Sequence, residues 1–119
     1  MTTKWFKKWS RKKSIEDRAL LDGIKFVQSG AGSVNLGCGL YKIRLAGQRK
    51  GKSGGYRTFL VYKKEQIAIY IYGFNKNEQE NISDKELQMY KKLADTFLNL
   101  SIADIDKAVR ASELIELEV

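Results

Sequence analysis

The chain has 119 residues, a hydrophobic fraction of 43% and a net charge of +8. This length and composition predict one globular domain spanning residues 1–119, and they exclude a disordered basic tail. The excess of bases favours nucleic acid or an acidic protein as a partner.

Several residue types are missing, which narrows the possible chemistry. The sequence has no histidine, so it lacks the commonest general base, a Ser-His-Asp triad and most zinc sites. Its one cysteine, Cys38, cannot form an intramolecular disulfide, which fits a reducing cytoplasm. No apolar run approaches the roughly 20 residues of a membrane span, although the basic, aromatic residues 4–9 leave a peripheral anchor as an alternative. We expect a cytoplasmic protein without a structural metal, cofactor, small-molecule substrate or membrane partner.

The N-terminal third is expected to form a helical hairpin or a bent helix. Residues 5–12 are rich in bases and aromatics, and Trp5 and Trp9, at i and i+4, would pack one helix face onto the body. Ser14 is the predicted N-cap of the second helix, because acids occupy the turn that follows it. Apolar residues then recur at helical spacing, namely Leu20, Leu21, Ile24 and Val27. Residues 30–33 end this helix.

Three strands follow. Residues 40–45 alternate, with Lys42 and Arg44 facing one way and apolar residues facing the core. Residues 46–55 form a loop with four glycines and three bases. Residues 56–62 and 67–74 are aromatic and β-branched, and the four residues between them suit a hairpin. The sequence predicts an antiparallel sheet with helices covering one face.

The C-terminal third returns to helices. Ser83 and Glu86 form a predicted capping box, and the helix that they open carries an apolar stripe at Leu87, Tyr90, Ala94, Phe97 and Leu98. A shorter helix is expected from Ser101 to about Ala111. The predicted fold class is therefore α+β, with a small antiparallel sheet of three to four strands packed against N-terminal and C-terminal helices.

Residues 40–77 carry the strongest functional signal. This segment contains nine bases, one acid and seven aromatic residues. Cations bind phosphates and aromatic rings stack on unpaired bases, so the combination suits single-stranded nucleic acid. RNA is the first ligand to consider.

Short stretches across most of the chain resemble the RelE/ParE superfamily of toxins from type II toxin–antitoxin systems. They are Lys4-Trp5-Phe6, Leu36-Gly37-Cys38-Gly39, Tyr41-Lys42, Gly51-Lys52-Ser53-Gly54-Gly55-Tyr56-Arg57, Tyr72-Gly73-Phe74, Lys76-Asn77-Glu78 and Asn81-Ile82-Ser83. The motif GKSGGYR is similar to that of the RelE-like or HigB-like branch. The resemblance implies a RelE-like fold with a concave basic sheet face, ribosome-dependent cleavage of mRNA, and neutralisation by a cognate antitoxin encoded beside the toxin.

The resemblance also implies the site residues. Lys42 and Arg44 match paired basic positions on one strand, and Arg57 matches the arginine that follows Gly-Tyr on the next. Lys76 stands where the best-known members have a second arginine, and the tyrosine that stacks on the substrate base has no clear equivalent. The implied catalytic residues are Lys42, Arg44 and Arg57, with Lys76 as a substitute for the second arginine. From the basic and aromatic character of this segment, the candidate RNA-binding residues are Lys50 and Lys52, with Tyr56, Tyr72 or Phe74 in place of the missing tyrosine.

The chemistry of these residues fits a metal-independent endoribonuclease, an mRNA interferase. A lysine crowded by other cations gives up its proton more readily, so Lys42 is the candidate base for the 2′-hydroxyl. Arginine keeps its proton, so Arg44 and Arg57 are candidate phosphate clamps. The ribosome would supply the placement of the message that this small set of residues lacks.

Other interpretations stay open from the sequence. Lys42 and Arg44 could form the solvated face of an edge strand. A ParE-like inhibitor of gyrase has the same fold without nuclease chemistry, although ParE-like chains generally lack the basic sheet cluster. A non-catalytic RNA-binding module would use the same cations for binding alone. The glycine loop lacks the P-loop spacing, which argues against an ATP site.

Overall fold

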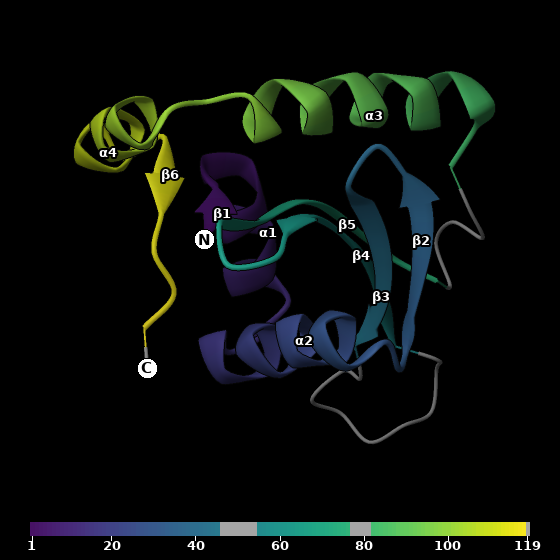
Figure 1. The fold of residues 1–119 in the computed structure, drawn as a ribbon. Coiled ribbons are helices and arrows are strands. Elements are labelled where there is room, and N and C mark those ends of the chain that lie inside the picture. The colour runs from purple at the N-terminus through teal and green to yellow at the C-terminus, as the bar shows by residue number, and fades with distance from the viewer. Residues whose placement is uncertain (46–54, 77–81, 119) are drawn as a thin grey trace.

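The structure, a computed structural model, describes residues 1–45, 55–76 and 82–118. The described residues form an α+β fold with four helices and one mostly antiparallel, six-stranded sheet in the order β2-β3-β4-β5-β1-β6 (Figure 1). In chain order the elements are β1 (Thr2–Thr3), α1 (Lys4–Lys12), α2 (Asp17–Ser29), β2 (Ser33–Gly37), β3 (Leu40–Leu45), β4 (Tyr56–Lys63), β5 (Ile67–Asn75), α3 (Asp84–Leu98), α4 (Ile102–Arg110) and β6 (Leu114–Ile115). The predicted fold class is confirmed, with more strands than the three to four expected.

The three predicted strands form the centre of the sheet, and three further strands extend it. On one side, β2 pairs antiparallel with β3. On the other side, β1 pairs parallel with β5 and antiparallel with β6. Since β2 lies outside β3, Lys42 and Arg44 are not on an edge strand, and that interpretation is wrong.

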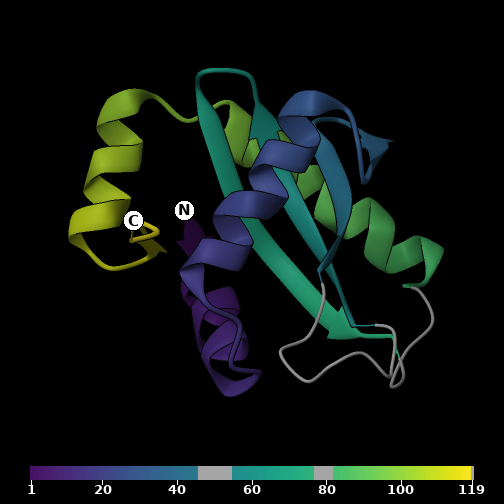
Figure 2. The same ribbon diagram turned by 90° about the horizontal axis from the view of Figure 1, so that it is seen from below.

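Helices cover both faces of the sheet, so the expectation that they cover one face is also wrong. Figures 1 and 2 show α2 and α3 on opposite sides of the strands. The α1–α2 side buries a core of Phe6, Ile15, Leu20, Val27, Ile43, Leu45, Leu60 and Tyr70. The α3 side buries Leu40, Phe59, Val61, Ile67, Ile69, Ile71, Phe74, Ala94 and Leu114. Apolar side chains therefore leave the central strands in both directions.

The junction of the first two helices differs from the prediction. Ser14 does not cap α2: its φ is +57°, and it lies just past the end of α1. The Ser14 N–H donates to the Arg11 carbonyl, and the Ile15 N–H donates to the Ser10 carbonyl. This is the Schellman ending of a helix, in which an apolar residue, here the buried Ile15, follows the left-handed position. The first residue of α2 is therefore Asp17.

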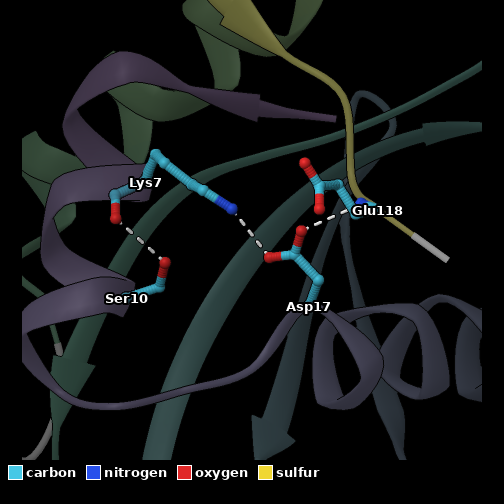
Figure 3. A network of polar contacts seen from close by, with 4 residues as sticks. All are labelled: Lys7, Ser10, Asp17 and Glu118. Carbon is cyan, nitrogen blue, oxygen red and sulfur yellow. Dashed lines mark hydrogen bonds and ion pairs between the residues drawn. The ribbon is translucent and has the colours of Figure 1, made fainter.

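Asp17 ties both N-terminal helices to the C-terminal segment (Figure 3). One carboxylate oxygen accepts from Lys7 Nζ at 2.7 Å, and the other accepts from the Glu118 N–H at 2.9 Å. Burial alone would raise the pKa of Asp17, but these hydrogen bonds and the charge of Lys7 outweigh it and lower the pKa. The charged form of Asp17 therefore stabilises this junction.

Both C-terminal helices begin as their sequences predict. Ser83 and Glu86 form the capping box of α3, and Ser101 forms one with Asp104 at the start of α4. The described residues include no helix long and apolar enough to cross a membrane.

Candidate nucleic-acid interface

Three of the predicted catalytic residues lie on one face of the central strands. Arg44 on β3 is directly opposite Arg57 on β4, and Lys42 is opposite Phe59 one row along. Opposite residues in an antiparallel pair have Cβ atoms about 5 Å apart, so the two arginines are neighbours. The intervening Ile43 is fully buried on the other face, which directs Lys42 and Arg44 to the same side.

The arginine pair places like charges side by side. Arg44 is exposed and Arg57 is partly buried. Burial first, and then the positive charge of Arg44, lowers the pKa of Arg57. Arginine remains protonated under such a shift, so both positive charges persist. Like charges directly opposite each other destabilise a sheet, and a bound phosphate would relieve that cost.

Lys76 lies at the same end of the sheet as the arginine pair. Phe74 on β5 is opposite Arg57, and Lys76 follows it by two residues. The Lys76 N–H donates to the Gly55 carbonyl at 3.4 Å, which holds Lys76 beside the start of β4. Its side chain is exposed. Along the strands, Lys42 and Lys76 therefore lie on either side of the Arg44–Arg57 row.

Tyr72 joins this face because of a β-bulge. The register between β4 and β5 shifts after Phe59, which is opposite Tyr72, whereas Leu60 is opposite Tyr70. Tyr70 consequently enters the α1–α2 core, where its hydroxyl donates to the Leu20 carbonyl at 2.7 Å. Tyr72 instead packs on the α3 side with Phe59. The bulge thus places Tyr70 and Tyr72 on opposite faces of the sheet.

Tyr72 belongs to an aromatic wall, a series of stacked rings formed by Tyr90, Tyr72, Trp5 and Trp9. Its ring stacks on Tyr90 of α3 at 4.8 Å and on Trp5 of α1 at 5.2 Å, both measured between centroids. Trp5 in turn stacks on Trp9 at 6.3 Å. Sequence reasoning assigned Trp5 to packing and Tyr90 to an apolar stripe, because contacts between α1, β5 and α3 have no local signal. The wall runs beside the Lys42–Phe59 row.

The other predicted aromatic residues are less open. Phe74 is 5% exposed and packs edge-on against Phe59, so its ring supports the site and offers little surface to a base. Tyr56 is partly exposed, and its ring meets Trp9 edge-on at 5.5 Å. It is opposite Leu45 and Asn75, hence on the other face from Arg57. Lys50 and Lys52 lie outside the described residues.

Glu86 is an acid that the sequence did not assign to this region. It lies on α3, and its negative charge raises the pKa of both Tyr72 and Tyr90. Burial is the largest cause in each case, and together with the charges of Tyr72 and Glu86 it raises the pKa of Tyr90 to about 12. Both phenols therefore keep their protons near neutral pH. They can donate hydrogen bonds, but they cannot act as bases there.

Metal and thiol chemistry have few candidate groups in the described part of the chain. No three histidine, cysteine, aspartate or glutamate residues among the described ones lie together in a way that could hold a metal ion. Cys38 is exposed in the turn after β2, with a φ of +57°. It lines a shallow depression with residues of α3, on the β2 side of the sheet. The cations of β3 and β4 therefore remain the candidate site.

Comparisons with known proteins identify a family for this chain. Neither the curated proteins nor the solved structures gave a match. A scan of protein families, however, matched residues 1–117 to the family described as RelE toxin of RelE / RelB toxin-antitoxin system. That match spans almost the whole chain, including both helices of the N-terminal third and the basic sheet face. The chain therefore belongs to the RelE toxin family.

Proposed function

We propose that this protein is a ribosome-dependent mRNA endonuclease that inhibits translation in the cytoplasm and is neutralised by a cognate antitoxin. The observation that carries the proposal is the Arg44–Arg57 pair on a solvent-facing part of the sheet, with Lys42 in the adjacent row. Family membership supports the same reading. The finer assignment to the HigB-like branch rests on the GKSGGYR motif alone.

In the proposed reaction the lysines transfer protons to and from the RNA, and the arginines stabilise negative charge on the phosphate. Lys42 accepts the proton of the 2′-hydroxyl, and the resulting oxygen attacks the adjacent phosphorus. Arg44 and Arg57 stabilise the charge that develops on the phosphate oxygens. The bond from phosphorus to the 5′-oxygen then breaks, and Lys76 gives that oxygen a proton. The products are a 2′,3′-cyclic phosphate and a 5′-hydroxyl, and the reaction needs no metal.

The positions of the two lysines support this division of roles. Lys42 precedes the arginine row on β3, and Lys76 follows it after β5. A base and an acid on opposite sides of the phosphate suit a displacement in which the attacking and leaving oxygens are in line. Placement of the message on the ribosome would complete the geometry.

Expression of the protein alone tests the proposal. We expect new mRNA 5′ ends within translated codons, carrying 5′-hydroxyl groups, and no DNA breaks. DNA breaks without new mRNA ends would support a ParE-like gyrase inhibitor. If neither appears, a non-catalytic RNA-binding module is the better account.

The antitoxin is a second part of the proposal. A surface with this excess of cations attracts acidic segments, so we expect a small, acidic, DNA-binding partner encoded beside the toxin gene. Its segment should cover Lys42, Arg44, Lys52 or Arg57, or lie on the helix from Ser83 to Leu98. Co-expression with the adjacent reading frame, followed by affinity purification, should recover the complex. The toxin–antitoxin assignment would be contradicted if the protein is harmless when expressed alone and the product of the adjacent reading frame does not co-purify with it.

A further inference from the structure

Trp5 is the feature that packing explains least. It is 49% exposed, although Phe6, the next residue, is fully buried in the α1–α2 core. About half of this large side chain is therefore in contact with water, although burying it would stabilise the fold. Its partner Trp9 is only partly exposed, and Trp9 fills the space that a side chain at Gly73 would occupy. Trp9 is thus packed against the sheet, whereas Trp5 contacts Tyr72 and Trp9 and still leaves about half of its surface open to solvent.

The exposed ring of Trp5 belongs to the same surface as the basic cluster. It stacks on Tyr72, whose strand neighbour Phe59 is opposite Lys42. One strand spacing of roughly 4.8 Å separates β4 from β5, and a further 5.2 Å separates the Tyr72 and Trp5 rings. Trp5 thus lies on the order of 10 Å across the sheet from β4, the strand that carries Arg57, and this is the span of a few nucleotides of a strand.

The surroundings of Trp5 also carry positive charge. Lys8 and Lys12 follow Trp5 at i+3 and i+7, so they share its side of α1. Both side chains are exposed. The helix contains five bases and no acid. A partly exposed ring beside cations is suited to hold an unpaired base together with its phosphates.

We propose that Trp5 is a positioning residue for RNA: its ring stacks on an unpaired base of the message a few nucleotides from the phosphate held by Arg44 and Arg57. Lys8 and Lys12 hold the adjoining backbone. The inference rests on the proposed function and adds a specificity contact to it. Trp5 touches no reacting atom, so it acts on the binding of the message.

Cleavage kinetics on ribosomes programmed with a defined codon test this inference. Loss of one stacked base weakens binding on the order of tenfold, so Trp5→Ala should raise KM about tenfold and change kcat by less than about threefold. Trp5→Phe retains a ring face and should restore most of the affinity. Trp5→Leu retains apolar packing without a ring and should resemble Trp5→Ala. Phe26→Ala removes a similarly exposed ring from α2 and is the matched control, with kinetics like the wild type.

Abasic nucleotides identify the partner base. With the base removed at the stacked position, wild type and Trp5→Ala should have the same KM, whereas abasic changes elsewhere should leave the tenfold difference intact. An unchanged KM for Trp5→Ala, equal kinetics for Trp5→Leu and Trp5→Phe, or an effect that no abasic position removes would overturn the inference while leaving the proposed function standing. If Trp5→Ala weakens only antitoxin binding, the ring serves a protein partner, and the inference is wrong. A wild-type protein that cleaves no message would contradict both.

Discussion

The two faces of the β3–β4 pair differ in what their side chains contact. Toward α1 and α2, Ile43 and Thr58 are fully buried, and the Thr58 hydroxyl donates to the Ile43 carbonyl at 3.1 Å. Toward α3, the adjacent residues Arg44 and Arg57 bring two positive charges together. The first arrangement stabilises the fold and the second costs stability. Alternation along two strands thus separates a structural face from a candidate reactive face, and substitutions on the two faces should have opposite signatures.

The largest expected effect is on the basic face. Lys42→Ala should lower the rate of message cleavage by roughly 10²–10⁴-fold, the usual contribution of a general base, and leave the free energy of unfolding nearly unchanged. Lys42→Arg retains the charge but not a proton that can be exchanged, so it should not restore cleavage. Single-turnover cleavage of ribosome-bound message measures both rates. Cleavage by Lys42→Arg at the wild-type rate would reduce Lys42 to an electrostatic contact.

The opposite signature belongs to Leu60, which is fully buried in the α1–α2 core. Leu60→Ala should lower the free energy of unfolding by about 2–5 kcal/mol, because it removes apolar contacts and leaves a cavity. Chemical denaturation measures this loss. At temperatures where the variant is folded, its cleavage rate per folded molecule should equal that of the wild type. A large loss of cleavage in folded Leu60→Ala protein would show that the two faces are coupled.

A smaller loss of stability is expected at Tyr70. Its buried hydroxyl donates to the Leu20 carbonyl at 2.7 Å and so fastens β5 to α2. Tyr70→Phe should cost about 1 kcal/mol in the free energy of unfolding and leave cleavage unchanged. Tyr72→Phe is the matched change on the other side of the bulge, and thermal melting of both proteins compares them. Greater destabilisation by Tyr72→Phe would contradict the placement of the two tyrosines.

The smallest effect concerns the junction at Asp17. The pKa of Asp17 is lowered in the folded protein, so its charged form stabilises the fold above the ordinary aspartate pKa of about 3.9, and this contribution is lost as pH falls through the folded value. Asp17→Asn should therefore be less stable than the wild type at neutral pH, by at most about 1 kcal/mol. The difference should shrink below about pH 4. Denaturation midpoints of both proteins between pH 3 and 7 test the trend, and a constant difference would refute it.

The two faces of β3 and the start of α3 could be predicted from local sequence. The alternation of Lys42 and Arg44 with Ile43 predicted the two faces of β3, because the side-chain period of a strand is two residues. The Ser83 capping box predicted the start of α3, since both of its groups lie within one turn. These features depend on neighbours in sequence. The prediction of the basic cluster as a set of residues also used the family resemblance.

The remaining features depend on contacts between distant segments. The bulge between β4 and β5 sends Tyr70 and Tyr72 to opposite faces, whereas regular alternation would put them on the same one. The strands β1 and β6 have two residues each, and they extend the sheet beyond β5, where β1 pairs with β5 and β6 pairs with β1. The spacing of Trp5 and Trp9 predicted a shared helix face, but not that one ring fills the space above Gly73 while the other stays half exposed.

Arg57→Ala, with cleavage and stability measured on the same preparation, shows whether the Arg44–Arg57 pair holds the phosphate. Removal of one transition-state contact to phosphate typically costs roughly 3 kcal/mol, or on the order of a hundredfold in rate. We expect this loss in single-turnover cleavage of ribosome-bound message, incomplete rescue by Arg57→Lys, and a protein that remains folded. Wild-type cleavage by folded Arg57→Ala protein would contradict the claim, as would a loss of cleavage fully explained by unfolding.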